Sequence, residues 1–148
     1  MVEFHGLQFD LPAQGADITD DLPKGSPPTL ARPSGVGVIQ FTTAIYRAGV
    51  NPEVTTQDLR NLVVDFCGRH SFHPGEFEER TDRVSRVGCV VEGADDLTAV
   101  WYVSNGRDVA LITYSGSGSD EFSATDELRQ ARQLVATIEF EGGFANDR

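Results

Sequence analysis

Short runs of apolar residues, several of them alternating with polar ones, predict β-strands along much of the chain. Enrichment in β-branched and aromatic residues is typical of strands, and it marks Val36–Tyr46, Arg83–Gly93, Leu97–Ser104 and Arg107–Ser115. Asn105-Gly106 separates the last two runs. We expect a type I′ hairpin turn there, because both residues tolerate a positive φ. Glu3–Pro12 and Gly75–Arg80 are weaker strand candidates, the first as a strand or tight hairpin.

Two other segments repeat their apolar residues at the helical period of 3.6. The first stripe consists of Leu59, Leu62, Val63, Phe66 and Cys67. Thr55 followed by Asp58 predicts the start of this helix, and Gly68 predicts its end. The second stripe consists of Leu128, Ala131, Leu134, Val135 and Ile138, and Ser123 to Asp126 predict its cap.

The order of these elements predicts an α+β fold with a mainly antiparallel, curved sheet flanked by two amphipathic helices. Val100 to Val103 are all apolar although they point to alternate faces, so we expect a helix on each face of the sheet. Ala13–Gly35 is rich in Pro, Gly, Ser and Asp and predicts a long loop. At 148 residues, the chain predicts a single domain, 1–148, with an ordered core over 3–141 and a flexible tail over 142–148.

Charge narrows the possible partners. The chain has 23 acidic and 12 basic residues, which gives a net charge of −11. Because nucleic acids and anionic membranes are bound through basic surfaces, we expect neither as a partner. One interpretation of the acidity is that it keeps the protein soluble. A more specific interpretation is that it attracts a basic protein partner. Nothing in the sequence indicates the oligomeric state.

The chain has no run of about 20 apolar residues, the length that spans a bilayer. Met1–Pro12 has neither a basic start nor a long apolar core, so it does not have the form of a signal peptide. We therefore expect a cytoplasmic protein, in which Cys67 and Cys89 lie in apolar surroundings as reduced thiols.

A search for chemistry predicts no catalytic residue, no cofactor and no metal. Cys67, His70 and His73 form a C-x-x-H-x-x-H string. Zinc uses such ligands, but Cys67 lies on the apolar stripe, so surface histidines after a helix end are the preferred interpretation. Tyr114–Asp120 is glycine-rich and precedes a helix, yet it lacks the spacing and the lysine of a phosphate loop.

Acidic residues next to predicted turns are the candidate partner-binding site. They are Glu78, Glu79, Asp95, Asp96, Asp120 and Glu121, all in the more negative half of the chain. Surface arginines, including Arg80 and Arg86, are expected to pair with acids and to add little stability. Trp101 and Tyr102 lie in the middle of a strand, where core packing is favoured over an interface role.

The layout resembles the PsbP-like α/β/α sandwich fold. The resemblance rests on an opening LQFDLP, the strand VGVIQFTTAIY, a helix, a meander ending in VWYVSNGRDVALITYSG and a closing ARQLVATIEF. It implies a curved antiparallel sheet between helices and a binding or assembly role. It also implies similarity to small bacterial adaptor and immunity proteins of secretion systems, such as type VI secretion, and no catalytic residues come with it.

The leading hypothesis is therefore a non-enzymatic protein-binding module that acts as a toxin immunity protein or an effector adaptor. It would cover a basic toxin or effector surface with its acidic residues. A second binding hypothesis is a chaperone for apolar segments. The alternative from another class is a small-ligand carrier or enzyme, with a pocket between sheet and helix near Ala13–Gly35.

Overall fold

The fold is that of a computed structural model, which describes residues 2–4, 7–9, 16–17, 22, 24, 27–31, 37–44, 53–73, 76–82, 84–92, 96–117 and 121–140. Its main element is an open sheet of seven strands in the order β3-β4-β5-β9-β8-β7-β6. All neighbouring strands of this sheet pair antiparallel, in agreement with the sequence prediction of a mainly antiparallel sheet. The strands are β3 (Ala16–Asp17), β4 (Thr29–Ala31), β5 (Gly37–Ala44), β6 (Glu78–Thr81), β7 (Ser85–Glu92), β8 (Asp96–Ser104) and β9 (Val109–Ser117).

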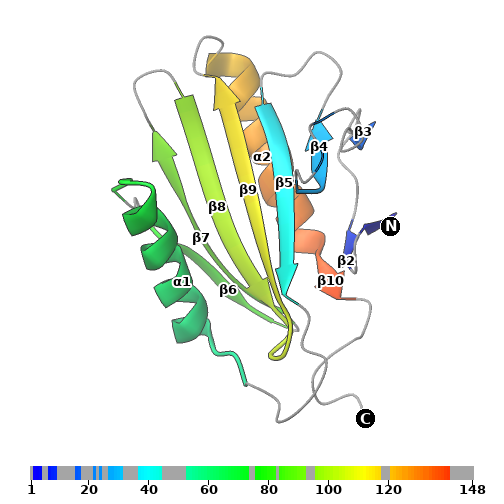
Figure 1. Ribbon diagram of the computed structural model, residues 1–148, viewed down its shortest axis with the longest axis vertical. Coiled ribbons are helices and arrows are strands. Elements are labelled where there is room, and N and C mark those ends of the chain that lie inside the picture. The colour runs from blue at the N-terminus through cyan, green and yellow to red at the C-terminus, as the bar shows by residue number, and fades with distance from the viewer. Residues whose placement is uncertain are drawn as a thin grey trace.

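A second, small sheet consists of β1 (Val2–Phe4), β2 (Leu7–Phe9) and β10 (Glu139–Phe140). β1 and β2 form the tight hairpin that the start of the sequence predicts. β10 pairs with β2 and so brings the segment after the last helix back to the first residues of the chain. In Figure 1 this small sheet lies beside β4 and β5, at one side of the large sheet.

The two helices lie on opposite faces of the large sheet, as Figure 1 shows. α1 (Thr56–Arg69) packs on β7 and β8, and α2 (Glu121–Thr137) packs on β9, β5 and β8. Alternate residues of β8 therefore enter different cores. Ala99, Trp101 and Val103 pack in the α2 core, whereas Val100 and Tyr102 pack in the α1 core. This confirms that the continuous apolar run of β8 is a strand covered on both faces.

The N-terminus of α1 forms as the sequence predicts, and its C-terminus differs by a short distance. Thr55 and Asp58 make a complete capping box, in which each side chain bonds the other residue's backbone N–H. Gly68 does not end the helix, which continues to Arg69. Ser71 takes the left-handed conformation with φ 59° instead. Its position fits a Schellman ending, because the N–H of Phe72 bonds the carbonyl of Cys67 and that of Ser71 bonds Gly68.

Two other sequence predictions are wrong in detail. The Ala13–Gly35 segment is not loop throughout, because it contains β3 and β4. Strands of two and three residues are too short to show an alternating pattern. α2 begins at Glu121, so Ser123 lies in its first turn and is not its cap. Its predicted stripe is nevertheless buried from Leu128 to Ile138.

The turn between β8 and β9 is also different from the predicted type I′ hairpin. Ser104 pairs with Val109, so the connection has four residues, and of these Gly106 alone has a positive φ. The side-chain oxygen of Asn105 accepts hydrogen bonds from the N–H groups of Arg107 and Asp108, at 3.0 and 2.8 Å. Asn105 therefore shapes this turn through its side chain and not through a left-handed backbone. The predicted tail over 142–148 lies outside the described residues.

Candidate functional site

The sheet face that carries α1 is hollowed beside the helix. α1 contacts β7 and β8, so the β9 and β5 side of this face lies beyond it, as Figure 1 shows. The hollow has a volume of about 300 Å³, which is at the lower end of the range for ligand sites. We call it the sheet groove. It is lined by Pro27, Gln40, Thr42, Phe66, His70, Phe72, Thr98, Leu111, Thr113 and Ser115.

The floor of the sheet groove is polar because three neighbouring strands place hydroxyl and amide side chains on the same face. The strand register pairs Gln40 with Thr113 and Thr98 with Ser115. Residues two apart share a face, so β9 contributes a row from Leu111 to Ser115. Gln40 is held in place by a hydrogen bond from its amide nitrogen to Thr29 Oγ1 at 3.4 Å. The floor therefore presents hydrogen-bonding side chains on the part of this sheet face that α1 leaves uncovered.

The wall of the sheet groove is aromatic and comes from the C-terminal end of α1. The His70 ring lies 4.3 Å from the Phe66 ring and 5.7 Å from the Phe72 ring, centroid to centroid. The Schellman ending places Phe72 back against the last turn of the helix, as its contact with Phe66 shows. Aromatic faces of this kind bind apolar groups and cations. The sheet groove therefore combines hydrogen-bonding groups below with an aromatic wall beside them.

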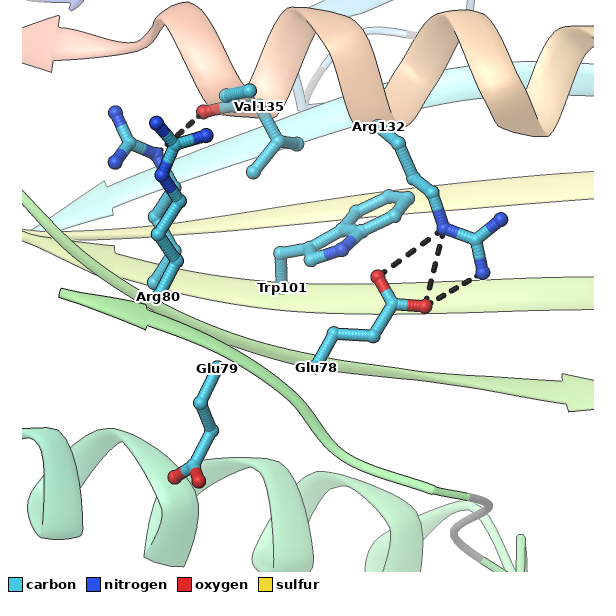
Figure 2. A pocket seen from close by; sticks show the side chains of 8 residues that line it. Glu78, Glu79, Arg80, Trp101, Arg132 and Val135 are labelled. Atoms are coloured by element: carbon cyan, nitrogen blue, oxygen red, sulfur yellow. Dashed lines mark hydrogen bonds and ion pairs between the residues drawn. The ribbon is translucent and has the colours of Figure 1, made fainter.

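A second, smaller hollow of about 130 Å³ lies between β6 and α2. Figure 2 shows Trp101 at its base, with Arg132 reaching from α2 to Glu78 on β6. Arg132 Nη2 lies 2.6 Å from Glu78 Oε2, and the Nε of Arg132 bonds both carboxylate oxygens. Trp101 is almost fully buried. Arg132 and Glu78 therefore bind one another across this hollow and connect the edge strand β6 to α2.

Arg86 is buried beside this second hollow and does not behave as the expected surface arginine. Its Nε donates to the Val135 carbonyl at 2.8 Å and its Nη2 to the Ile138 carbonyl at 3.1 Å, both at the end of α2. Its Nη1 bonds Asp82. The pKa of the Asp82 carboxyl lies below its ordinary value, chiefly because the Val84 N–H donates to it and also because Arg86 stabilises its charge. Arg80, as expected, is an exposed partner of Asp82.

Tyr102 is a buried residue of β8 that packs in the core beneath α1. Burial raises the pKa of its hydroxyl above the ordinary value, and Arg69 at the end of α1 opposes the rise through its charge and a hydrogen bond. The hydroxyl is therefore a neutral group in the α1 core at physiological pH. Both Trp101 and Tyr102 are core residues, which confirms the sequence interpretation.

Among the predicted partner-binding carboxylates, the structure describes the side chains of Glu78 and Glu79, and these two do not share a surface. Glu78 and Glu79 point to opposite faces of β6 (Figure 2), where Glu78 binds Arg132 and Glu79 binds Arg60 at 2.9 Å. Asp96 begins β8 and Glu121 begins α2, but their side chains are not described. Asp95 and Asp120 lie outside the described residues. Partner binding by these six residues remains a prediction.

The residues of the C-x-x-H-x-x-H string do not converge. Cys67 is buried and faces Cys89, whereas His70 packs on the groove wall and His73 is exposed. Within the described ranges, no group of three metal-ligating side chains lies close enough to hold an ion. Neither of the described helices is long and apolar enough to cross a membrane.

Sequence reasoning missed the sheet groove. Its floor residues are threonines, a serine and a glutamine, which carry no recognisable motif. A signal was present in Val109–Ser115, where Leu111, Thr113 and Ser115 become steadily more polar while Ala110, Ile112 and Tyr114 stay suited to a core. That gradient indicates a strand that is covered fully on one face and only in part on the other.

Comparisons with known proteins support the fold. No protein-family model matches the chain, and no curated protein matches it. Among solved structures, a cyanobacterial PsbP (CyanoP) from Synechocystis is similar with a TM-score of 0.52 and 11% identity, over 94% of this chain and 95% of that one. A protein from Bacteroides thetaiotaomicron is similar with a TM-score of 0.54 and 10% identity, over 93% of this chain. This chain spans 46% of the length of the Bacteroides protein. The protein has an α+β, PsbP-like fold.

Proposed function

We propose that the protein is a non-enzymatic binding module that holds a cationic segment of a protein partner in the sheet groove. The observation that carries this proposal is the half-covered sheet face, where a polar floor lies beside an aromatic wall. The backbone of an extended partner segment can hydrogen-bond to the polar side chains of the floor. An arginine or lysine side chain of that segment can pack against the aromatic wall. The chain contains such a contact itself, because Arg60 lies 4.3 Å from the centre of the Phe77 ring.

Charge supports a cationic partner over a neutral one. Six of the eight described basic side chains are in ion pairs within the chain: Arg60, Arg80, Arg86, Arg107, Arg129 and Arg132. The net charge of −11 is thus carried by carboxylates in excess of these pairs. Such a field attracts a basic partner and raises its association rate. An immunity protein or effector adaptor that covers a basic toxin surface is the specific role that this mode of binding suits.

A peptide selection tests the proposal. A library of random displayed peptides is selected on the purified protein, and each selected peptide is measured against Thr42→Trp, which places an indole on the exposed floor. The matched control is Thr81→Trp, the same change on an exposed residue of the edge strand β6, four strands away from β5. We expect arginine- or lysine-bearing peptides that bind the wild type and the control but not Thr42→Trp. Their affinity should fall about tenfold between low and physiological salt. Selection of acidic peptides, or equal binding to both variants, contradicts the proposal.

A small-ligand carrier is the second candidate, favoured by the volume of the sheet groove and by its position. Pro27 lines it and lies within Ala13–Gly35, the segment beside which a ligand pocket was expected. Native mass spectrometry of protein purified without denaturation tests this role. A bound mass that is present in the wild type and in Thr81→Trp but lost in Thr42→Trp supports a ligand. Unmodified mass in all three proteins argues against a ligand carrier.

A further inference from the structure

Two buried thiols from different elements face one another beneath α1. Cys67 Sγ, near the end of α1, lies 3.8 Å from Cys89 Sγ in β7. Both side chains are buried, at 1% and 0% exposure. They are also the two cysteines of the whole chain. The pairing joins positions 22 residues apart, which sequence spacing alone does not predict.

The two sulfurs face one another inside the α1 core. The α1 core that holds them also contains Val63, Phe66, Val87 and the ring of Tyr102. No third metal-ligating side chain joins the pair in the part of the chain that the structure describes. A disulfide needs the two sulfurs to approach by a further ~1.8 Å, to about 2.05 Å. Packing of α1 on β7 already holds the two residues opposite one another.

We propose that Cys67 and Cys89 are a modification site, at which a peroxide converts the two thiols into one intramolecular disulfide. One thiol loses its proton, and the thiolate attacks an oxygen of hydrogen peroxide, so that an S–O bond forms, the O–O bond breaks and the released hydroxide takes up that proton and leaves as water. The second cysteine, after loss of its thiol proton, attacks this sulfenic sulfur, so that the S–S bond forms, the S–O bond breaks and the hydroxide takes up that proton and leaves as a second water. One peroxide is reduced to two waters, and two thiols are oxidised. This proposal is independent of the proposed function.

The disulfide would fasten the end of α1 to the sheet. Cys67 lies between Phe66 and His70, two residues of the groove wall. Because the sulfurs are buried, the oxidant reaches them when this end of α1 opens locally. If the disulfide forms more readily in the native state than in the unfolded state, thermodynamic linkage requires that the disulfide stabilise the native state by the same factor. We therefore expect the oxidised protein to unfold at a higher temperature than the reduced protein.

Oxidation of the full-length protein with hydrogen peroxide tests the site. We expect an intact mass lower by about 2 Da, and a thiol count under denaturing conditions that falls from two to zero. After trypsin digestion, peptide 61–69 should be joined to peptide 87–107. Cys89→Ser is the control, in which this loss of mass cannot occur. A gain of about 32 Da at one cysteine, a disulfide-linked dimer, or two intact thiols under conditions that oxidise free glutathione would overturn the proposal.

A glutathione redox titration gives a second readout that does not depend on access. The equilibrium between thiols and disulfide is measured in buffer and in urea that unfolds the chain. We expect the disulfide to be favoured about tenfold or more in the native protein, because the fold holds the sulfurs together. An equal or smaller constant in the native protein means that the packing opposes the bond, and the proposal fails.

Discussion

Arg86 donates from its Nε to the carbonyl of Val135 at 2.8 Å, which ties the strand β7 to the last turn of α2. α2 has no basic residue of its own in that turn. The last carbonyls of a helix have no partners within the helix and carry a partial negative charge. A buried arginine from another element therefore caps α2, and the same guanidinium bonds Ile138 and Asp82.

Replacement of Arg86 by methionine should lower the free energy of unfolding by about 2–3 kcal/mol. The change keeps most of the side-chain volume but leaves buried carbonyls without donors. Arg80→Met is the matched control, because Arg80 binds the same Asp82 from an exposed position and should change stability by less than about 0.5 kcal/mol. Urea unfolding measures both. Equal losses in the two variants would show that α2 does not depend on Arg86.

The Asp82 carboxylate should add stability that disappears in acid. Its pKa in the folded chain lies below the ordinary 3.8, so the folded state prefers the charged form. The contribution is therefore fully present above pH 3.8 and is lost as the pH falls through the lower, folded pKa. Urea unfolding of the wild type and Asp82→Asn between pH 7 and pH 2 should show a difference at neutral pH that closes in acid. A difference that is constant across the range would contradict this.

The same substitution at two glycines should have opposite effects. A Cβ at Gly88 would overlap the Trp101 ring and lie 2.6 Å from the Val100 carbonyl, whereas at Gly68 it meets nothing within 4 Å. Gly88→Ala should cost about 1–3 kcal/mol and shift the fluorescence of Trp101, the one tryptophan of the chain. Gly68→Ala in α1 should stabilise by about 0.5–1 kcal/mol. Loss of stability in both variants would mean that Gly68 has a role in packing.

Ser71→Gly should stabilise the end of α1 by about 0.5–1 kcal/mol. Ser71 has φ 59°, where glycine has no steric cost. Ser115→Gly is the matched control, because it makes the same change at an exposed strand residue of the groove floor. Glycine weakens a strand, so this variant should be less stable than the wild type. Thermal unfolding measures both changes. A lower midpoint for Ser71→Gly would indicate that its hydroxyl, and not its backbone, determines this helix ending.

The sequence predicts the fold well where the pattern is long, and poorly where geometry depends on few residues. The stripes of α1 and α2 and the apolar run of β8 each contain enough residues to define a period and a face. β3 and β4 are too short to show one, and the turn at Asn105 depends on a side-chain hydrogen bond. The sequence around Arg86 does not distinguish it from a surface arginine, because its burial depends on the end of α2, which is distant in the sequence.

The candidate site was harder to predict because it depends on what α1 leaves uncovered. No residue type marks the floor of the sheet groove, whose polar side chains come from β5, β8 and β9. Charge, the strongest bulk signal, pointed to turn acids instead. Of these acids, Glu78 and Glu79 each bind an arginine on their own face of β6, and partner binding by the six residues stays a prediction.

The central claim, that a cationic protein segment binds in the sheet groove, is tested most directly by NMR. Backbone amide shifts of the labelled protein are recorded during titration with an arginine-bearing peptide obtained by the selection described above. The account predicts perturbations along Leu111–Ser115 and Phe66–Phe72, with no change along Glu78–Thr81. Perturbations concentrated at Glu78 and Glu79, with no change in the groove residues, would contradict this claim. Such a result would favour the predicted acidic residues as the binding site.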